Sequence, residues 1–119
     1  MTTLNIEFNQ DKTKDNMFKN YRKTRTLIKG NTYHLWVADT EAKKRRGLRG
    51  VLGLPRHHGM IFVYNEPVRH DFTMVGVKIP LTLIFLNKYF QIVDIKNGKP
   101  GQQRVVPSKD YYYVIEVQG

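Results

Sequence analysis

Short apolar runs in the second half of the chain predict a protein built mainly of β-strands. Each run is either apolar throughout or alternates between apolar and polar residues, and Gly, Pro, Asn or charged residues separate one run from the next. Evenly spaced short strands between turn residues are typical of a β-sandwich or barrel. The predicted strands are residues 60–64, 72–75, 81–86, 90–95 and 111–117.

Two further strand signals lie in the first half of the chain. Residues 4–8 alternate between apolar and polar positions, which indicates a half-buried strand. Residues 26–29 and 32–37 are β-prone and flank Gly30-Asn31, so we expect a hairpin whose tight turn uses these two residues, because both tolerate positive φ. The polar stretch between these signals, residues 10–23, contains three apolar side chains at helical spacing. They indicate either one or two docked helical turns or a tethered loop, and they are Met17, Phe18 and Tyr21.

One short helix is predicted at residues 41–46. Asp39 or Thr40 is placed to cap its N-terminus, and Gly47 is a natural stop because glycine accepts a left-handed backbone at low cost. Glu41 is expected to pair with Arg45 across one turn. The sequence thus predicts a mainly β protein with one short α-helix.

The composition limits the class of protein. At 119 residues, with 40% hydrophobic and 25% charged residues, the chain is expected to form a single domain over residues 1–119, in which residues 1–32 are a basic segment holding the first strand, the arm and the start of the hairpin. The absence of Cys excludes disulfides and thiolate chemistry. No apolar run approaches the ~18 residues of a membrane span, and no signal-peptide pattern is present. We therefore expect a cytoplasmic or particle-associated protein without a membrane partner.

The net charge of +10 is the next signal, and it is uneven. Residues 1–50 hold twelve basic and five acidic residues, whereas residues 51–119 hold eight and five. The densest basic cluster is a candidate polyanion-binding site, with solvated helix surface as the alternative, and it comprises Lys43, Lys44, Arg45, Arg46 and Arg49. Aromatic residues that could stack on bases, or simply fill the core, are Tyr21, Tyr33 and Trp36.

No arrangement of residues in the sequence indicates catalysis. The adjacent pair His57-His58 lacks a carboxylate at a typical ligand offset, which argues against a metal site. His70 and Asp71 are neighbours expected to point to opposite sides of a strand, so they would not act together. Ser108 lies in a polar loop without the turn that exposes a nucleophile. We therefore predict no catalytic residue, no metal ligand and no cofactor.

A series of short motifs resembles one known family. In order, these motifs are Ala38-Asp39-Thr40, Gly47-Leu48, Leu54-Pro55, Gly59-Met60-Ile61-Phe62, Phe72, Met74, Ile79-Pro80-Leu81 and Ile84-Phe85-Leu86. Their order and spacing, from about residue 33 to the end, are similar to the family called domain of unknown function 192. The resemblance implies a jelly-roll-like antiparallel sandwich with a short helix, and it implies no established activity. The matched positions read as scaffold, above all Asp39, Gly47, Gly59, Met60, Phe72, Met74 and Pro80.

The chain departs from this family pattern at several positions. Arg49 replaces a Met, Thr73 replaces a Trp, and Thr82 replaces an Asp, while Val75-Gly76-Val77 stands for Lys-Asn-Thr. If those residues line a site in relatives, the site is rebuilt or lost in this chain.

Three functions remain open from the sequence. The first is a non-catalytic binding or structural module with a protein partner, such as a component of a phage virion. The second is a nucleic-acid-binding protein that uses the basic helix. The third is an enzyme of unknown reaction, which a pocket lined by polar groups beside Thr73 and Thr82 would favour and an apolar filling there would exclude.

Overall fold

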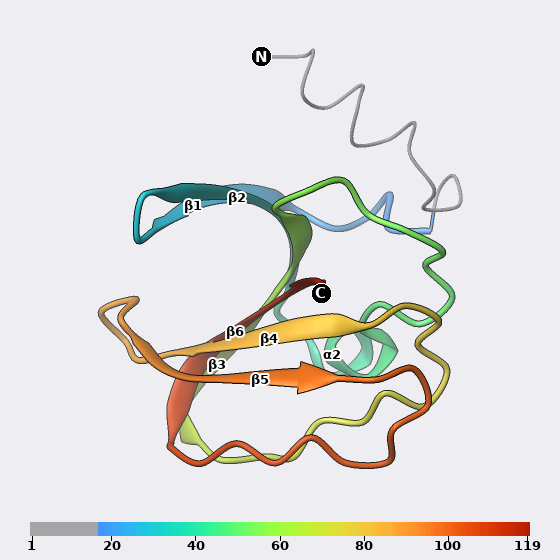
Figure 1. Ribbon diagram of the computed structural model, residues 1–119. Coiled ribbons are helices and arrows are strands. Elements are labelled where there is room, and N and C mark those ends of the chain that lie inside the picture. The colour runs from blue at the N-terminus through green and yellow to red at the C-terminus, as the bar shows by residue number, and fades with distance from the viewer. Residues whose placement is uncertain (1–16) are drawn as a thin grey trace.

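The computed structural model describes residues 17–119, and the strand predicted at residues 4–8 lies outside this region. Six strands and one short helix account for its regular structure (Figure 1). In chain order they are β1 (Lys23–Ile28), β2 (Asn31–Ala38), α2 (Glu41–Arg46), β3 (His58–Val68), β4 (Leu81–Leu86), β5 (Ile92–Gly98) and β6 (Tyr111–Gln118). The predicted fold class, mainly β with one helix at residues 41–46, is confirmed. No helix within residues 17–119 is long and apolar enough to span a bilayer.

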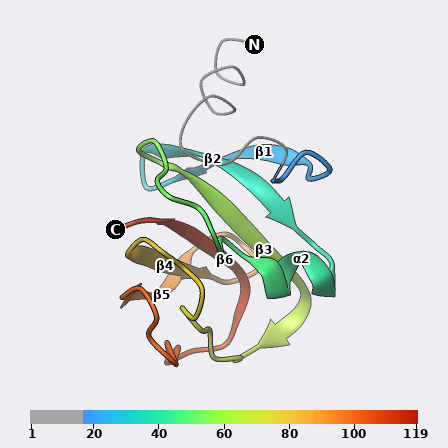
Figure 2. The same ribbon diagram turned by 90° about the vertical axis from the view of Figure 1, so that its right-hand side faces the viewer.

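The strands form one sheet in the order β1-β2-β3-β6-β4-β5. Four of the five pairings are antiparallel, as expected for the family, but β2 and β3 run parallel. A parallel pair needs a long crossover connection, and here residues 39–57 with α2 provide it. Figure 2 shows α2 beside β3, at the end of β2.

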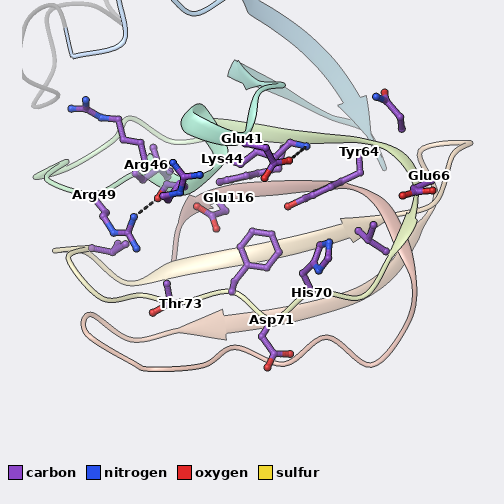
Figure 3. Close-up of a pocket in the computed structure, with 18 residues that line it drawn as sticks. Glu41, Lys44, Arg46, Arg49, Tyr64, Glu66, His70, Asp71, Thr73 and Glu116 are labelled. Carbon is purple, nitrogen blue, oxygen red and sulfur yellow. Dashed lines mark hydrogen bonds and ion pairs between the residues drawn. The ribbon is translucent and has the colours of Figure 1, made fainter.

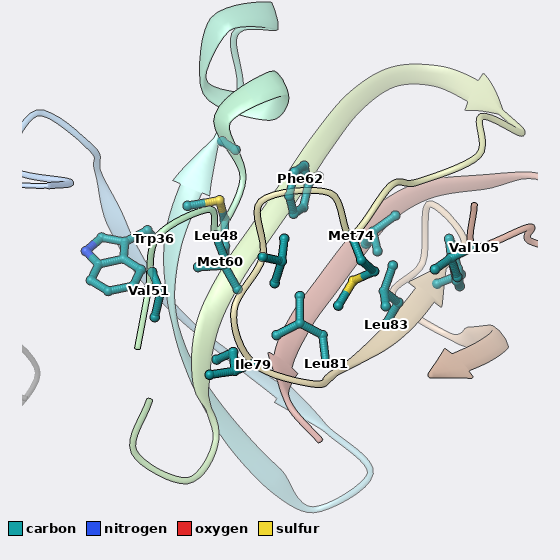
Figure 4. Close-up of a cluster of buried hydrophobic side chains, with 14 of the residues drawn as sticks. Trp36, Leu48, Val51, Met60, Phe62, Met74, Ile79, Leu81, Leu83 and Val105 are labelled. Atoms are coloured by element: carbon teal, nitrogen blue, oxygen red, sulfur yellow. The ribbon is translucent and has the colours of Figure 1, made fainter. Parts of the chain in front are cut away.

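Both faces of the sheet are buried. One face, which we call the loop-side core, packs under the connections between strands (Figure 4). Leu48, Met74 and Val105 enter it from loops, and Met60 and Phe85 from strands. The other face, which we call the inner core, gathers buried residues from five strands, with Ile92 of β5 packed against them. The bent sheet makes this possible because it brings the β1–β2 and β4–β5 hairpins to the same side (Figure 1). Loops, rather than a second sheet, therefore cover one face of the sheet.

The β1–β2 turn falls one residue earlier than predicted. Ile28 pairs with Asn31, so the two central residues are Lys29 and Gly30, with φ of 49° and 84°. Two positive φ values are typical of the type I′ hairpin turn, which favours glycine at its second central position. With Lys29 and Gly30 as the central residues, Gly30 takes this second position, whereas in the predicted turn it would take the first. Both arrangements place Ile28 on the same face as Tyr33, so alternation in the sequence does not distinguish them.

The strand predicted at residues 72–75 is instead a loop that lies on the sheet. Only Phe72 makes a β-bridge, to Val105. The Thr73 hydroxyl accepts a hydrogen bond from the Val75 N–H at 3.2 Å, and the next residue, Gly76, has a φ of 83°. This local turn removes the segment from the ladder while Met74 stays buried. The prediction failed because apolar loop residues that cover a sheet resemble strand residues in composition.

The helix is capped as its sequence predicts. The Thr40 hydroxyl accepts a hydrogen bond from the Lys43 N–H at 3.2 Å, and Gly47 ends the helix with a φ of 53°. Glu41 pairs with Lys44, at 3.9 Å, rather than with Arg45. Asp39, one residue before the cap, accepts a hydrogen bond from Arg22 at 2.5 Å. These contacts fix the helix against the end of β2.

The remaining scaffold residues serve packing and turns. Met60 and Met74 are buried in the loop-side core, and Phe72 is half-buried beside it. Pro80 is exposed, and its carbonyl accepts a hydrogen bond from Gly119 N–H at 2.9 Å. Gly59 is buried where β3 meets β6, and a Cβ there would lie 1.8 Å from the Glu116 carbonyl oxygen.

Candidate functional site

A pocket of about 630 Å³ lies between α2 and the sheet (Figure 3), and we call it the α2 pocket. Helix α2 and the following residues through Arg49 form one wall, and residues 70–73 form the opposite wall. β3 and Glu116 of β6 lie between these walls. The volume falls in the range of sites that hold small molecules.

The basic cluster predicted from the sequence does not form one surface. Lys43 lies on the far side of the helix, with its Nζ 4.9 Å from the Tyr21 ring centroid and 3.9 Å from Asp39. Lys44 faces the α2 pocket, with its Nζ 4.0 Å from the Tyr64 ring centroid. Cations at these positions gain from the electron-rich ring faces, so both lysines have specific neighbours within the domain.

Arg45 and Arg46 are the exposed members of the cluster. Both line the mouth of the α2 pocket, and the Arg46 guanidinium also lies 5.4 Å from the ring centroid of Phe18. Both residues are exposed overall, which leaves them accessible to a charged partner. The cluster therefore divides into one residue outside the pocket, one within it and two at its rim, with Arg49 as a separate case.

Arg49 is fixed by the backbone. Its Nε donates to the Val75 carbonyl at 2.8 Å, and its Nη1 donates to the Arg45 carbonyl. Its methylenes also lie so near Gly76 that a Cβ there would come within 3.1 Å of them. The side chain is half-buried and lines the pocket, and within residues 17–119 no hydrogen bond occupies its Nη2 group. A guanidinium held this way keeps a donor free in a defined direction.

Glu116 is the buried acid of the site. Its side chain lies among the pocket residues, and only 5% of the residue is exposed. Burial raises the pKa of its carboxyl to about 8, and the positive charge of Arg49 only partly opposes this rise. Among residues 17–119 no hydrogen bond to this carboxyl is present. At neutral pH it is therefore mostly a neutral acid that can donate as well as accept a hydrogen bond.

Aromatic rings form the apolar side of the pocket. Phe62 and Phe72 meet edge to face at 5.3 Å between centroids, and Tyr64 packs on Tyr111 at 5.6 Å. The Tyr111 hydroxyl donates to the His70 carbonyl at 2.8 Å and accepts from the His70 N–H at 3.0 Å. Tyr111 therefore ties the wall at residues 70–73 to the sheet. Burial raises the pKa values of both tyrosines, so neither ionises near neutral pH.

The position of Tyr111 differs from what alternation predicts. Regular alternation along β6 would place Tyr111 and Tyr113 on one face, yet Tyr111 is in the loop-side core and Tyr113 packs against the inner core. The register shifts between the pairs Val63–Tyr113 and Val68–Tyr111, and this irregularity breaks the alternation. With the alternation broken, the Tyr111 ring lies in the loop-side core, where it packs behind Tyr64 of the pocket wall.

Thr73 and Thr82, which the sequence analysis linked to a possible enzyme pocket, lie apart in the structure. Thr73 lines the α2 pocket, but the Thr82 hydroxyl donates to the Asn97 amide oxygen on the β4–β5 hairpin. Ser108 is hydrogen-bonded to Asp94, through both its N–H and its hydroxyl at 2.8 Å. Within the described residues, no three His, Asp or Glu side chains are grouped to hold a metal ion.

Sequence reasoning missed Glu116 and Tyr64. Glu116 did carry a signal, because it is a lone acid between Val114-Ile115 and Val117, in a strand that is otherwise apolar. An acid at an inward-facing position of such a strand is rarely buried without a partner. Arg49, whose positive charge acts on this carboxyl, is 67 positions away along the chain, so its proximity follows from the fold alone.

The fold and the pocket together define a mainly β domain with a polar cavity beside its helix. The chain belongs to the family called domain of unknown function 192, described as an uncharacterized ACR, whose model matches residues 24–119. This confirms the family resemblance, and the match begins early enough to take in the β1–β2 hairpin. No protein of curated function matches the sequence.

Two solved structures share the fold. A candidate transcription regulator from Sinorhizobium meliloti 1021 superimposes with a TM-score of 0.72 at 25% identity, covering 83% of this chain and 82% of that chain. A protein of unknown function from Novosphingobium aromaticivorans DSM 12444 gives a TM-score of 0.70 at 23% identity, covering 83% of this chain and 74% of that chain.

Proposed function

We propose that this protein is a non-catalytic binding module that holds a small polar ligand in the α2 pocket. The observation that carries the proposal is Arg49, whose guanidinium is fixed by two backbone carbonyls while it lines the cavity. A side chain ordered in advance loses little freedom when a ligand arrives, and this favours binding. The buried acid and the aromatic wall supply the mixture of polar and apolar groups that is typical of ligand sites.

A binding role also fits the surroundings of the titratable groups. Within residues 17–119, neither His70 nor Glu116 is hydrogen-bonded through its side chain to a hydroxyl that could act as a nucleophile. Nucleophilic catalysis relies on such a pair. The polar lining beside Thr73 meets half of the condition that favours an enzyme, because Thr82 lies outside the pocket. Without a paired nucleophile, this lining supports ligand recognition more directly than a reaction.

The test is a thermal-shift screen of small polar metabolites against the wild-type chain and two tryptophan variants. Thr73→Trp places a large ring at the pocket wall, whereas Val106→Trp adds the same ring at a position that is 50% exposed and outside the pocket. A ligand at 100 times its Kd is expected to add about 2.7 kcal/mol to the wild type and to Val106→Trp. Thr73→Trp is expected to lose this gain. Hits that stabilise both variants equally, or a screen without hits, would contradict the proposal.

Nucleic-acid binding is a second candidate. It is supported by the net charge of +10, by the exposure of Arg45 and Arg46, and by the description of the Sinorhizobium structure as a candidate transcription regulator. Exposed cations near one helix can neutralise phosphates and release counterions.

Fluorescence anisotropy with duplex DNA between 50 and 200 mM salt tests this candidate. If Arg45 and Arg46 contact phosphates, the double variant Arg45→Ala/Arg46→Ala is expected to bind less tightly, and the slope of log K against log salt should fall by about two. The charge-matched control is Lys88→Ala/Lys109→Ala, at exposed positions away from the pocket. Equal slopes for the two double variants would rule out the helix as the contact surface.

A further inference from the structure

We propose that the ligand of the α2 pocket is a small anion with a planar apolar body, whose anionic group lies between Arg49, Lys44 and the carboxyl of Glu116. This inference rests on the proposed function and names the chemical class of its ligand. Carboxylate, sulfonate and phosphate monoesters share the chemistry required.

The acidic residues around the pocket do not oppose an anion. Asp71 is bound by Arg104, with contacts of 2.8 and 2.6 Å, and Figure 3 shows its carboxylate pointing away from α2. The Glu41 side chain is 86% exposed and pairs with Lys44 at 3.9 Å. Glu66 is exposed at the outer end of the pocket. These charges are therefore paired or screened by water.

Unlike these acids, the cations Lys44 and Arg49 are largely shielded from water and held in fixed positions at the pocket. The side chain of Lys44 is only 14% exposed and is held over the Tyr64 ring. Arg49 keeps its Nη2 group available because its other contacts are to backbone carbonyls, which are neutral. A guanidinium whose contacts are neutral carries its full charge into the pocket, and charge-assisted hydrogen bonds to an anion are about twice as strong as neutral ones.

The protonation state of Glu116 favours a ligand with a negative charge. Arg49 and Tyr64 interact with its charge, while Lys44 and Glu41 of α2 and His70 and Asp71 of the opposite wall line the same pocket. Because its carboxyl is mostly protonated at neutral pH, it can donate a hydrogen bond to a bound anion. An anion beside it favours the protonated form further, so anion binding and protonation of Glu116 support each other. A cationic ligand would have to displace this proton while lying beside two positive charges.

The body of the ligand is expected to be planar. Phe62, Tyr64 and Phe72 line the pocket, with His70 at its edge. Flat rings stack or meet edge to face with such a wall and gain attraction beyond that of the area buried. An anion attached to a ring would therefore contact both the cationic groups and the aromatic wall of the pocket.

Three probes of one shape test the charge. Benzoate, benzamide and benzamidine differ in charge but little in size, and none changes its charge between pH 6.5 and 9. Each is titrated to 10 mM into the ¹⁵N-labelled full chain, and amide shifts are followed. We expect benzoate to shift the amides of Arg49, Phe72 and Glu116, and to bind about tenfold more weakly at pH 9 than at pH 7, as a pKa of about 8 requires. Benzamidine is expected to give no saturable shifts at these amides.

Two variants test the residues. Arg49→Met keeps an apolar stem and is expected to weaken benzoate binding at least tenfold, whereas Arg56→Met, at an exposed position outside the pocket, is expected to leave it unchanged. Glu116→Gln retains a hydrogen-bond donor, so benzoate should still bind, but the tenfold loss between pH 7 and 9 should disappear.

Several results would overturn the inference. These are preferential binding of benzamidine, equal benzoate binding by Arg49→Met and the wild type, or a pH dependence that survives in Glu116→Gln. Absence of benzoate shifts at 10 mM would also overturn it. The metabolite screen judges the proposed function separately, because uncharged or cationic hits that Thr73→Trp abolishes would uphold the pocket while the anion is rejected.

Discussion

Replacing Gly59 by alanine is expected to prevent folding or to lower the free energy of unfolding by at least about 4 kcal/mol, the range reserved for severe local disruption. A Cβ at this position would lie 1.8 Å from the carbonyl oxygen of Glu116, and a backbone oxygen cannot rotate out of the way. Gly59 lies within the ladders that join β3 to β2 on one side and to β6 on the other. Relief of the clash would have to separate β3 from β6 at the centre of the sheet.

Gly101→Ala is the matched control for this prediction. A Cβ at Gly101 meets nothing within 4 Å, although its φ of 78° makes alanine strained there. We expect this variant to lose only about 1–2 kcal/mol. Urea unfolding followed by circular dichroism compares the two, with soluble yield as the readout if Gly59→Ala does not fold. Similar losses for both variants would show that β3 and β6 can move apart cheaply.

Glu116→Gln is expected to remove most of the decline in stability of the domain between pH 5 and pH 8. The pKa of the carboxyl is about 8 in the folded protein and about 4.5 when it is fully exposed to water, so the unfolded chain loses its proton first as pH rises. The folded state then binds more protons than the unfolded state, and linkage makes the free energy of unfolding fall with rising pH. The decline begins near the unfolded pKa and levels off above the folded one. Its upper bound is about 5 kcal/mol, at about 1.4 kcal/mol for each pKa unit.

Thermal melts of the wild type and Glu116→Gln at half-unit steps from pH 5 to 9 measure this effect. Other groups contribute to each curve, and His34, whose pKa is lowered mainly by burial, has the opposite sign below pH 6.5. The difference between the two curves cancels these contributions, because both chains share them. Parallel curves across the whole range would mean that Glu116 is ionised or hydrated in the folded protein.

The sequence predicted the parts of the fold that depend on local patterns. The helix at residues 41–46 and the strand at residues 81–86 have the predicted bounds, because capping residues and a continuous apolar run are local signals. The parallel pairing of β2 with β3 has no local signal. Neither does the register shift between β3 and β6, next to which Tyr111 lies on the other face from Tyr113. Both are decided by packing between distant segments.

The candidate site was predicted only in fragments. Two positions that depart from the family pattern, Arg49 and Thr73, do line the α2 pocket, whereas a third, Thr82, does not. Five neighbouring cations suggested one surface, yet helical geometry sends Lys43 and Lys44 to different sides. Glu116 entered no prediction, since its role depends on contacts made by residues far away in the chain.

The sheet order also changes how the positive charge of the chain is understood. β1 and β5 lie at the two ends of the sheet, so each has a row of backbone groups that no further strand of residues 17–119 pairs with. Such edges can join those of other copies and begin aggregation. β1 carries the exposed Lys23 and Arg25, β5 carries Asp94 and Lys96, and the ladder beside β5 is irregular near Leu86. We therefore expect the two cations on β1 to oppose edge-to-edge association with other copies, independently of any ligand.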